Sequence, residues 1–388
     1  MKKVWVGNRL SEIANVNFFD YSITYYGVNT EVNFSFSTTI RIPTQYSNNF
    51  TDFTIGKIDD LIVREKGNIE FHFYNPIFAH KIANRKKELF KYFMNINSSE
   101  TLSWINSKIF TRLWLSNSID VPKFALLSKN ECTVQNLCNL FKGSNSFIIQ
   151  KHISGGGEGT YLIDIDIEEE VLNEISANSL YLVSPFYDNA NTICCHIIVY
   201  NDYIIVFPFG IQNSCEIDNK FIYQGSDYIS GQNISYDIKN ILLHNAISVG
   251  KNLSHIGYRG ICGFDFILVS NEILFIEVNA RYLGSTFVIN KALAENNEPS
   301  IFELNSDCFS NHPKYKDFNA QGLKINYRSK TERNGKKTLF KDDITKTISD
   351  FISSCQSEVF FDGLEIAQVV KPDTYLFREI IHRSFNLQ

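Results

Sequence analysis

The chain has 388 residues, of which 44% are hydrophobic and 20% are charged, and its formal net charge at pH 7 is −5. This length is too great for one compact core, so we expect a globular protein of two to four domains or lobes. The acidic balance argues against nucleic-acid binding, which requires a basic surface.

Membrane and secretory signals are not found in the sequence. We find no run of 18 apolar residues that would predict a transmembrane helix, and the first residues turn polar too soon for a signal peptide. The eight cysteines form no CxxC pair, so we expect structural thiols rather than a disulfide framework. Cys194 and Cys195 lie in a predicted strand and should point to opposite faces. These features predict a cytoplasmic protein with no membrane partner.

The first hundred residues have the pattern of an α/β lobe. Short alternating runs at residues 4–6, 31–42, 60–64 and 69–74 predict strands, and residues 79–94 have helical spacing. One further helix is predicted over residues 100–116. It ends before Pro122, which cannot continue a helix.

From that point strands and helices alternate at short spacing, which predicts an α/β chain built of mixed α+β lobes. Strands are predicted over residues 123–127, 146–153, 160–167, 180–183, 192–200 and 203–211. Helices are predicted over residues 133–141, 168–176, 235–255 and 286–295. Beyond residue 300 we expect strands, a polar loop at residues 329–337 and a helix at residues 342–355.

A β-hairpin is predicted where residues 263–269 and 273–279 form two strand patterns around Ser270, Asn271 and Glu272. If Asn271 is the centre of the loop, Val269 faces Ile273. Because side chains alternate along a strand, one face is wholly apolar. Its members are Phe264, Phe266, Leu268, Leu274, Ile276 and Val278.

The other face of this hairpin carries polar side chains. Asp265 falls directly opposite Glu277, and Asn279 lies two positions further on. Like charges opposite each other destabilise a sheet unless something offsets them. Mg²⁺ prefers carboxylate and amide oxygens, so these three residues predict a metal site. The alternative is that both acids lie on the solvated face of an ordinary hairpin.

The residues after the hairpin extend this polar face. Arg281 falls on the next alternate position, and Gly284 and Ser285 could bring backbone donors to an anion.

A glycine-rich segment lies between two predicted strands, with glycines at 155, 156, 157 and 159. Gly155, Gly156, Gly157 and Gly159 can present backbone amides to a phosphate group without steric hindrance. The segment is not a P-loop, because no Gly-Lys-Ser/Thr follows, and it does not open a helix as a dinucleotide-binding turn does. We expect a loop that closes over phosphates, with a mobile hairpin tip as the alternative. The carboxylate of Glu158 should point away from a polyphosphate.

Taken in order, these features over residues 106–300 resemble the ATP-grasp superfamily of carboxylate–amine ligases. The metal motif of that family is an acid followed, after roughly a dozen residues, by E-x-N-x-R, and Asp265 with the run from Glu277 to Arg281 is similar to it. Lys108, which precedes the segment Ile119-Asp120-Val121-Pro122, resembles the first nucleotide-binding lysine of the family. Gln150 stands where the second such lysine is usual.

The resemblance implies an ATP-grasp fold behind an N-terminal α/β domain of the pre-ATP-grasp kind. Residues 1–100 would be that domain, residues 101–182 the central lobe with the glycine loop, and residues 183–388 the C-terminal lobe with the metal site and an extension. ATP would be bound by Lys108, by Gln150 and by the glycine loop. The adenine-binding hinge would be Val183, Ser184 and Phe186, and the ribose contact is unassigned.

The chemistry implied by the resemblance is acyl activation. One or two Mg²⁺ ions, with Mn²⁺ as an alternative, would bridge the phosphates of ATP at Asp265, Glu277 and Asn279. A substrate carboxylate would form an acylphosphate and release ADP, and an amine would then displace phosphate. Arg281 would be catalytic, pairing with the carboxylate or the tetrahedral intermediate.

The substrates are less defined by the resemblance than the reaction is. Arg259, Arg281, Gly284 and Ser285 are the candidate substrate residues, with a surface ion pair as an equal alternative for Arg259. Amino acids or peptides are the favoured carboxylate and amine, and a homodimer is left open. Two other functions stay open: a nucleotide-binding regulatory or scaffold protein without turnover, and a phosphotransferase.

Overall fold

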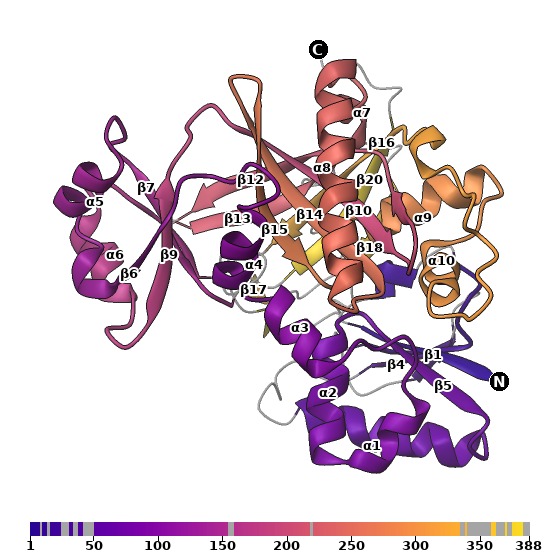
Figure 1. Ribbon diagram of the computed structural model, residues 1–388. Helices are drawn as coiled ribbons and strands as arrows, with labels where there is room; N and C mark the ends of the chain where they lie inside the picture. Colours follow the sequence, from indigo (N-terminus) through magenta and orange to yellow (C-terminus); the bar gives the residue numbers. More distant parts are fainter. Residues whose placement is uncertain are drawn as a thin grey trace. The chain divides into compact units, whose positions relative to one another are not determined.

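The computed structural model describes residues 1–7, 10–13, 16–24, 31–33, 38–41, 50–153, 159–217, 220–333, 338–339, 358–361, 369–370 and 375–382. The chain forms two compact units (Figure 1). The first unit comprises Met1–Ser99, Arg259–Ile261 and Arg281–Gln388, and the second comprises Glu100–Tyr258 and Cys262–Ala280. Helices and strands are mixed in both, as the α/β prediction requires. The predicted division at residues 1–100, 101–182 and 183–388 stays a prediction.

The first unit contains a sheet whose described strands are ordered β3-β4-β2-β1-β5. Strand β1 (Lys2–Val6), which lies between β2 and β5, is parallel to both of these neighbours. The other strands are β2 (Tyr21–Thr24), β3 (Glu31–Asn33), β4 (Thr38–Arg41) and β5 (Ile69–Phe73). Helices α1 (Phe50–Arg64) and α2 (Pro76–Arg85) contribute Ile58, Leu61, Ala79 and Ile82 to its core.

Three predictions for this region are wrong. Residues 31–42 are not one strand but contain two, β3 and β4, which pair antiparallel with each other. Residues 60–64 are not a strand but the last part of α1, because five residues are too few to distinguish alternation from helical spacing. Residues 79–94 are not one helix. α2 ends at Arg85 and a 3-10 helix, η3 (Lys87–Tyr92), follows after Lys86, whose backbone is not helical.

The C-terminal part of the chain completes the first unit. Its described elements are α9 (Thr286–Glu295), α10 (Ile301–Asp307), β16 (Tyr327–Arg333), β17 (Thr338–Leu339), β18 (Glu358–Phe361), β19 (Val369–Val370) and β20 (Tyr375–His382). β20 pairs antiparallel with both β16 and β18. The polar loop predicted from residue 329 is therefore wrong as far as Arg333, and the helix predicted at residues 342–355 lies outside the described residues.

The second unit is built on a path of hydrogen-bonded strands ordered β15-β14-β10-β12-β13-β8-β7-β9-β6, with β11 beside β10. The strands are β6 (Ala125–Ser128), β7 (Phe147–Lys151), β8 (Thr160–Ile163), β9 (Leu180–Pro185), β10 (Asn191–Val199), β11 (Ile204–Val206), β12 (Gly210–Ile217), β13 (Lys220–Asp227), β14 (Gly260–Val269) and β15 (Glu272–Asn279). The helices are α3 (Ser99–Ile105), α4 (Lys108–Leu115), α5 (Val134–Leu140), α6 (Glu168–Glu174), α7 (Tyr228–Gly231) and α8 (Tyr236–His255).

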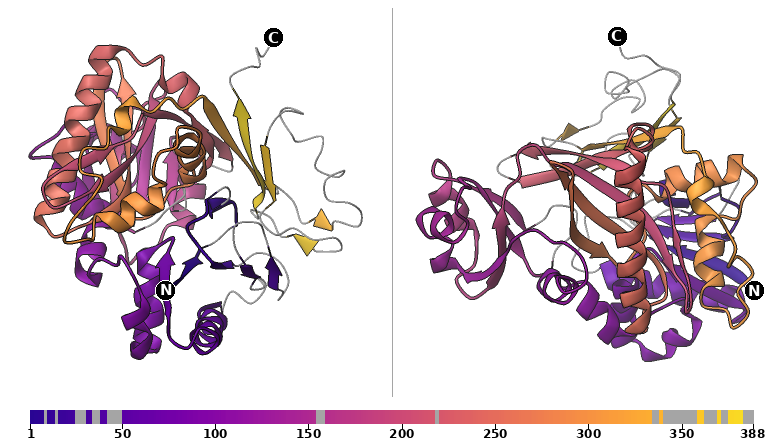
Figure 2. Two further views of the ribbon diagram at one scale, coloured as in Figure 1. Left: turned by 90° about the vertical axis from the view of Figure 1, so that its right-hand side faces the viewer. Right: turned by 45° about the horizontal axis from the view of Figure 1, so that its top comes forward.

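Helix α8 packs against the strands β10, β11 and β15 and covers one face of their sheet (Figure 2). Its apolar positions Leu242, Ala246, Val249 and Leu253 recur at helical spacing and enter one core with Ile197 and Phe264. A second core lies around β7, β8 and β9. Residues 203–211 are not one strand: β11 ends at Val206, and β12 begins at Gly210 after Pro208.

The helix predicted over residues 100–116 is two helices, α3 and α4. The break falls at Ser107, whose extended backbone lets its hydroxyl accept a hydrogen bond from the Phe110 amide at 3.2 Å. This is an N-cap, and the cap outweighs the continuous apolar periodicity on either side. Lys108 therefore becomes the first residue of α4, and its amide donates to the His152 carbonyl at 2.7 Å.

The hairpin β14–β15 has the predicted pairing of Asp265 with Glu277 but reaches it by a different route. The turn has two residues, Ser270 and Asn271, both with positive φ, so Val269 faces Glu272 and not Ile273. A β-bulge at Ile276 then shifts the register by one residue. The two differences cancel at the acid pair.

The same bulge changes which side chains share a face. The predicted apolar face is wrong for β15 near the turn. Ile273 and Phe275, not Leu274 and Ile276, are in the core with Phe264. Between the turn and the bulge, each residue of β14 pairs with the β15 residue one position earlier than the predicted loop would give.

Candidate active site

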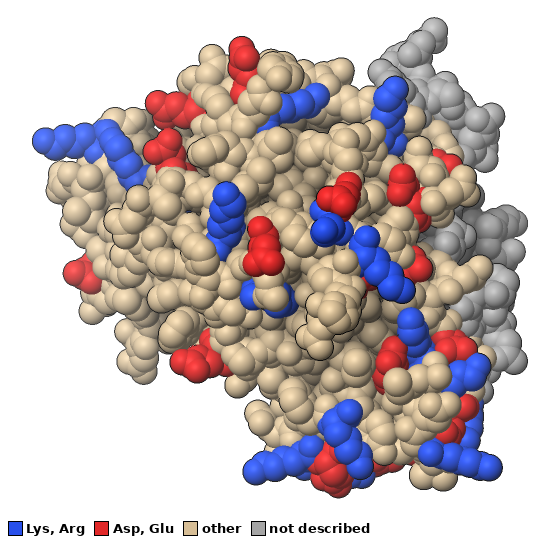
Figure 3. All heavy atoms as spheres, turned by 45° about the vertical axis from the view of Figure 1, so that its right-hand side comes forward, with Lys and Arg blue, Asp and Glu red and all other residues tan. Residues whose placement is uncertain are grey.

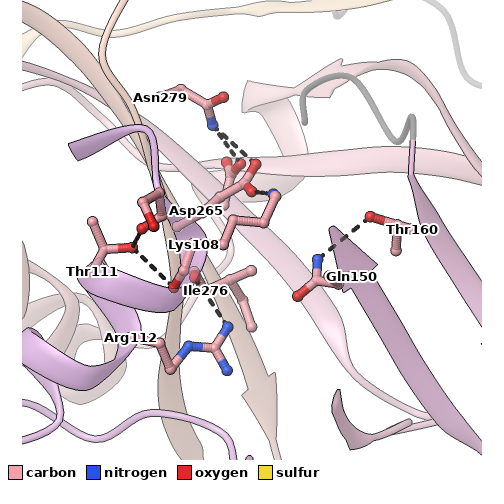
Figure 4. Close-up of polar contacts among 10 residues, drawn as sticks. Lys108, Thr111, Arg112, Gln150, Thr160, Asp265, Ile276 and Asn279 are labelled. Atoms are coloured by element: carbon pink, nitrogen blue, oxygen red, sulfur yellow. Dashed lines mark hydrogen bonds and ion pairs between the residues drawn. The ribbon is translucent and has the colours of Figure 1, made fainter. Parts of the chain in front are cut away.

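The two acids of the hairpin meet at its polar face in the second unit (Figure 4). The side-chain amide of Asn279 lies between them: its Nδ2 donates to Asp265 Oδ2 at 3.0 Å and to Glu277 Oε1 at 3.2 Å. Glu277 is 17% exposed at its side chain. The alternation along β15 brings Glu277 and Asn279 to one side, and the pairing with β14 adds Asp265.

Lys108 neutralises part of the charge of this acid pair. Its ammonium forms an ion pair with Glu277 Oε2, and its side chain is 9% exposed. The N-cap at Ser107 sets this position, because it makes Lys108 the first helical residue. The hydroxyl of Thr111 donates to the Ser107 carbonyl at 3.0 Å and stabilises the first turn of α4 (Figure 4).

The groups gathered here suit a hard divalent cation. The two carboxylates offer oxygen ligands around one point, and Mg²⁺ prefers such ligands. The Asn279 side chain directs Nδ2 to both carboxylates in this structure, so its amide would have to turn over to give Oδ1 to a cation. In the part of the chain that the structure describes, no group of three or more His, Cys, Asp or Glu side chains is arranged so that it could hold a metal ion. Mg²⁺ is commonly held by one or two carboxylates together with water and substrate phosphates, so two acids fit it.

The two strands on either side of the glycine-rich segment, β7 and β8, pair antiparallel. Gln150 on β7 is buried, pairs across the sheet with Thr160 and Leu182, and donates from Nε2 to Thr160 Oγ1 at 3.4 Å. It is the last residue but one of β7, and Figure 4 shows its side chain directed to Thr160. This position agrees with a contact to nucleotide, which stays a prediction.

The predicted hinge lies at the end of β9. Val183 points into a core and pairs with Ile149 of β7 and Ala125 of β6. The described pairing with β6 ends there, so Ser184 pairs with β7 alone. The Phe186 amide donates to the Ser146 carbonyl at 3.0 Å. If this segment binds adenine, the backbone beyond Val183 is the part to do so.

The glycine loop is described only at its ends. Gly155, Gly156 and Gly157 lie outside the described residues. Gly159 has φ of +69°, and its carbonyl accepts a hydrogen bond from the Lys151 amide at 2.9 Å. This bond holds the two ends of the loop together, and a Cβ on Gly159 would lie 2.8 Å from Lys151 Cδ.

The predicted substrate residues belong to the first unit. Arg281 Nη1 donates to the Tyr74 hydroxyl at 3.1 Å and to the Tyr282 carbonyl at 3.0 Å. The backbone of Arg259 is held by Asn97, whose amide accepts from its N–H at 2.8 Å and donates to its carbonyl at 2.7 Å. The roles of both arginines stay predictions.

Gly284 and Ser285 are also in the first unit. Ser285 is buried and directly precedes α9. Its carbonyl accepts from the Val288 amide at 3.0 Å, so this backbone is part of the helix start. A role of Gly284 and Ser285 in substrate binding stays a prediction.

One residue near the acids was not found by the sequence reasoning. Arg112 on α4 is 1% exposed, and its Nη2 donates to the Ile276 carbonyl at 3.1 Å. Its spacing could have indicated its position, because Arg112 lies four residues after Lys108 and therefore on the same side of a helix.

Comparison with known families agrees with this arrangement. Residues 105–285 match the family model described as ATP-grasp domain, and this range includes Lys108, Gln150 and the acid pair. The chain therefore contains an ATP-grasp domain, as the resemblance in the sequence predicted. A comparison with curated protein sequences gives no match.

Solved structures share the fold over almost the whole chain. N5-carboxyaminoimidazole ribonucleotide synthetase from Thermotoga maritima is 17% identical, with a TM-score of 0.60, over 99% of this chain and 94% of that one. L-amino acid ligase from Bacillus licheniformis is 14% identical, with a TM-score of 0.62, over 99% and 94%. The biotin carboxylase domain of 2-oxoglutarate carboxylase from Hydrogenobacter thermophilus is 12% identical, with a TM-score of 0.64, over 98% and 86%. At these identities the likeness shows the fold.

Two surface properties bear on partners. On the face drawn in Figure 3, basic and acidic side chains are interspersed. Among the described residues, no helix is long and apolar enough to span a membrane.

Proposed function

We propose that this protein is an ATP-dependent ligase that joins a carboxylate to an amine through an acylphosphate and releases ADP and phosphate. The observation that carries the proposal is the meeting of Asp265, Glu277, Asn279 and Lys108 inside an ATP-grasp domain. Two acids from a hairpin, one amide and one buried ammonium are the groups needed to hold a metal–polyphosphate.

ATP would lie with its phosphates at this acid pair. Asp265, Glu277 and Asn279 would hold Mg²⁺ or Mn²⁺, which supplies charge neutralisation to the transferring phosphoryl group. Lys108 would exchange its ion pair with Glu277 for a phosphate oxygen, keeping its ammonium paired in both states. Gln150 and the glycine loop would complete the phosphate contacts, with adenine at the hinge from Val183 to Phe186.

The reaction would proceed in two displacements. A carboxylate oxygen attacks the γ-phosphorus, an oxygen–phosphorus bond forms, and the bond to the β-phosphate oxygen breaks to release ADP. An amine nitrogen then attacks the acyl carbon, a carbon–nitrogen bond forms, phosphate leaves and the amine loses a proton. Arg281, whose guanidinium has donors in a planar arrangement, would pair with the carboxylate.

The substrate class is open between two kinds of carboxylate. The amino acid ligase among the similar structures favours an amino acid or short peptide, as the sequence also predicted. The carboxylase domain was solved with bicarbonate, so bicarbonate is the second candidate. Arg259, Arg281, Gly284 and Ser285 are the residues that we propose to face the substrates.

The proposal is tested by ADP release from Mg²⁺-ATP in the presence of hydroxylamine and a panel of amino acids and peptides, with bicarbonate in a separate arm. We expect one carboxylate to cause ADP release, with a hydroxamate as the product in the amino-acid arm. Glu277→Gln should abolish this release. Glu272→Gln, a change to an exposed acid of the same hairpin, should not.

The outcomes separate the alternative functions. Binding of Mg²⁺-ATP without turnover of any panel member would favour a regulatory or scaffold protein. A stable phosphorylated product that hydroxylamine does not intercept would indicate a phosphotransferase. Equal turnover by wild type and Glu277→Gln would contradict the proposed site.

A further inference from the structure

The turn of the β14–β15 hairpin does not by itself bring the two acids together. Its two-residue loop pairs Val269 with Glu272, and an uninterrupted ladder from that pair would place Ile276 opposite Asp265. Glu277 would then lie opposite Phe264, which is fully buried in the core. The bulge at Ile276 moves Glu277 to the position opposite Asp265, so the acid pair depends on the bulge.

A bulge leaves the extra residue outside the ladder, and its backbone groups need other partners. Here the carbonyl of Ile276 accepts from Arg112 Nη2 at 3.1 Å. The neighbouring Phe275 amide donates to the Asp120 carbonyl at 2.9 Å. Strand β15 ends the strand path of the second unit, so α4 and the segment at Asp120 contact its outer edge.

Helix α4 thus contacts two consecutive residues of β15 from one side. Arg112 holds the backbone of Ile276, and Lys108, one helical turn earlier, pairs with the side chain of Glu277. Figure 4 shows both side chains extending from α4 toward the hairpin. The register of the bulge and the direction of the Glu277 carboxylate are fixed from the same helix.

Burying the guanidinium of Arg112 at this position is energetically unfavourable. Burial lowers the pKa of its guanidinium to about 10, and its Nε and Nη1 atoms have no hydrogen-bond partner in the described structure. The ring centre of Phe124 lies 6.0 Å from its guanidinium carbon. An apolar side chain of similar volume would pack there without these unpaired donors, so core stability does not explain an arginine.

We propose that Arg112 is a positioning residue: by binding the Ile276 carbonyl it maintains the β15 bulge, and the bulge keeps Glu277 beside Asp265 for cation binding. The inference rests on the proposed function, because the cation is that of the metal–nucleotide complex. Arg112 itself touches neither the nucleotide nor the cation in this account.

The direction in which Arg112→Met changes the cation affinity distinguishes a positioning role from a purely electrostatic one. A positive charge near the site repels a divalent cation, so removing that charge alone would strengthen cation binding. If Arg112 acts by holding the bulge, Arg112→Met weakens cation binding instead. Arg112→Lys keeps one donor directed at the carbonyl and should restore part of the loss.

The probe is Mn²⁺ with a non-hydrolysable ATP analogue, measured by electron paramagnetic resonance and by calorimetry. We expect Arg112→Met to weaken Mn²⁺ binding about tenfold, the low end for a residue that orients metal ligands, with Arg112→Lys intermediate. Lys239→Met is the matched control: Lys239 also donates to a main-chain carbonyl, that of Gln232 at 2.7 Å, and its loss should leave Mn²⁺ affinity unchanged.

Deletion of Ile276 provides a test that does not depend on the stability of Arg112→Met. The deletion removes the extra residue, and the straight ladder then pairs Asp265 with Glu277 without a bulge. In that background Arg112→Met and Arg112→Lys should change Mn²⁺ affinity by less than about twofold, because the Ile276 carbonyl that Arg112 binds is absent. If Arg112→Met does not fold, the comparison of Arg112→Lys with and without the deletion carries the test.

Several results would overturn the inference. One is unchanged or tighter Mn²⁺ binding by a folded Arg112→Met, or by Arg112→Lys if only that variant folds. Another is a loss of Mn²⁺ affinity in the Arg112 variants that is equally large with and without Ile276. Glu277→Gln in the same titration separates this failure from that of the proposed function. If Glu277→Gln abolishes Mn²⁺ binding while the Arg112 variants keep it, only the inference fails. If Glu277→Gln binds like wild type, the metal site itself is wrong.

Discussion

The buried ion pair of Lys108 and Glu277 leads to a prediction for stability that does not require a known substrate. Lys108→Met removes an ammonium that is 9% exposed and leaves Glu277, at 17%, beside Asp265 without its cation. Removing one partner of a buried ion pair costs about 3–5 kcal/mol. The lower end applies here because Asn279 still donates to both carboxylates. A loss of about 3 kcal/mol lowers the Tm of a unit of this size by roughly 6–12 °C.

Thermal unfolding followed by circular dichroism, with and without Mg²⁺, measures this loss. Mg²⁺ should raise the Tm of Lys108→Met more than that of wild type, because the ion can take the place of the missing ammonium beside the carboxylates. Lys108→Arg keeps a cation and should lose less. Lys86→Met is the matched control, since the ion pair of Lys86 with Asp59 at 2.7 Å is about one-third exposed and is screened by solvent, so its loss should lower the Tm much less.

Two results would refute this reasoning. Lys108→Met could be as stable as Lys86→Met, which would mean that the ammonium does not offset the charge of the acid pair. Mg²⁺ could also raise the Tm of wild type and Lys108→Met equally, which would mean that the cation does not bind where the ammonium was.

Three further predictions concern other parts of the second unit. His196 is fully buried, which lowers the pKa of its imidazole from 6.5 to about 3. As the pH falls, the unfolded chain is protonated at this histidine before the folded chain is, so the free energy of unfolding decreases below pH 6.5, by about 2 kcal/mol at pH 5. Urea unfolding of wild type and His196→Gln at neutral pH and at pH 5 measures this decrease. Gly159→Ala should cost about 1–2 kcal/mol in urea unfolding and weaken nucleotide binding in calorimetry, because of its φ of +69° and the contact with Lys151. Ser107→Ala should cost about 1 kcal/mol in urea unfolding by removing the α4 cap, and should weaken Mn²⁺-nucleotide binding because Lys108 begins that helix.

Each of these has a control in the same chain. Gly56→Ala in α1, where a Cβ meets no atom within 4 Å, should not destabilise the protein. Ser235→Ala removes the cap of α8 at a similar cost but should leave Mn²⁺-nucleotide affinity unchanged. A His196→Gln variant that loses as much stability as wild type between neutral pH and pH 5 would contradict the assignment to His196.

Much of the site could be predicted from the sequence because its geometry is local. Glu277 and Asn279 stand two residues apart on β15, so period-two alternation places them on one side, whereas their pairing with Asp265 depends on the bulge. The α9 bounds were predicted correctly for a similar reason, since helical spacing over Thr286–Glu295 is uninterrupted. Family resemblance added the ATP-grasp fold, and the match over residues 105–285 agrees with it.

Predictions failed where a local pattern had two solutions. The three-residue loop around Asn271 and the two-residue turn observed are both compatible with the composition Ser-Asn-Glu, and they differ by one residue in register. The run at residues 100–116 has apolar spacing throughout, and only the side chain of Ser107 turning back to the Phe110 amide divides it.

By itself the sequence determined the position of the hairpin, long helices such as α8 and α9, and the presence of two acids, an amide and a lysine of ATP-grasp type. The tertiary structure alone decided how the acids come to face each other. The bulge at Ile276 is stabilised by Arg112, a residue 164 positions away, and by the Asp120 carbonyl. A residue displaced from the ladder needs other partners for its backbone groups, and here these partners come from a distant helix and loop, which the local sequence does not show.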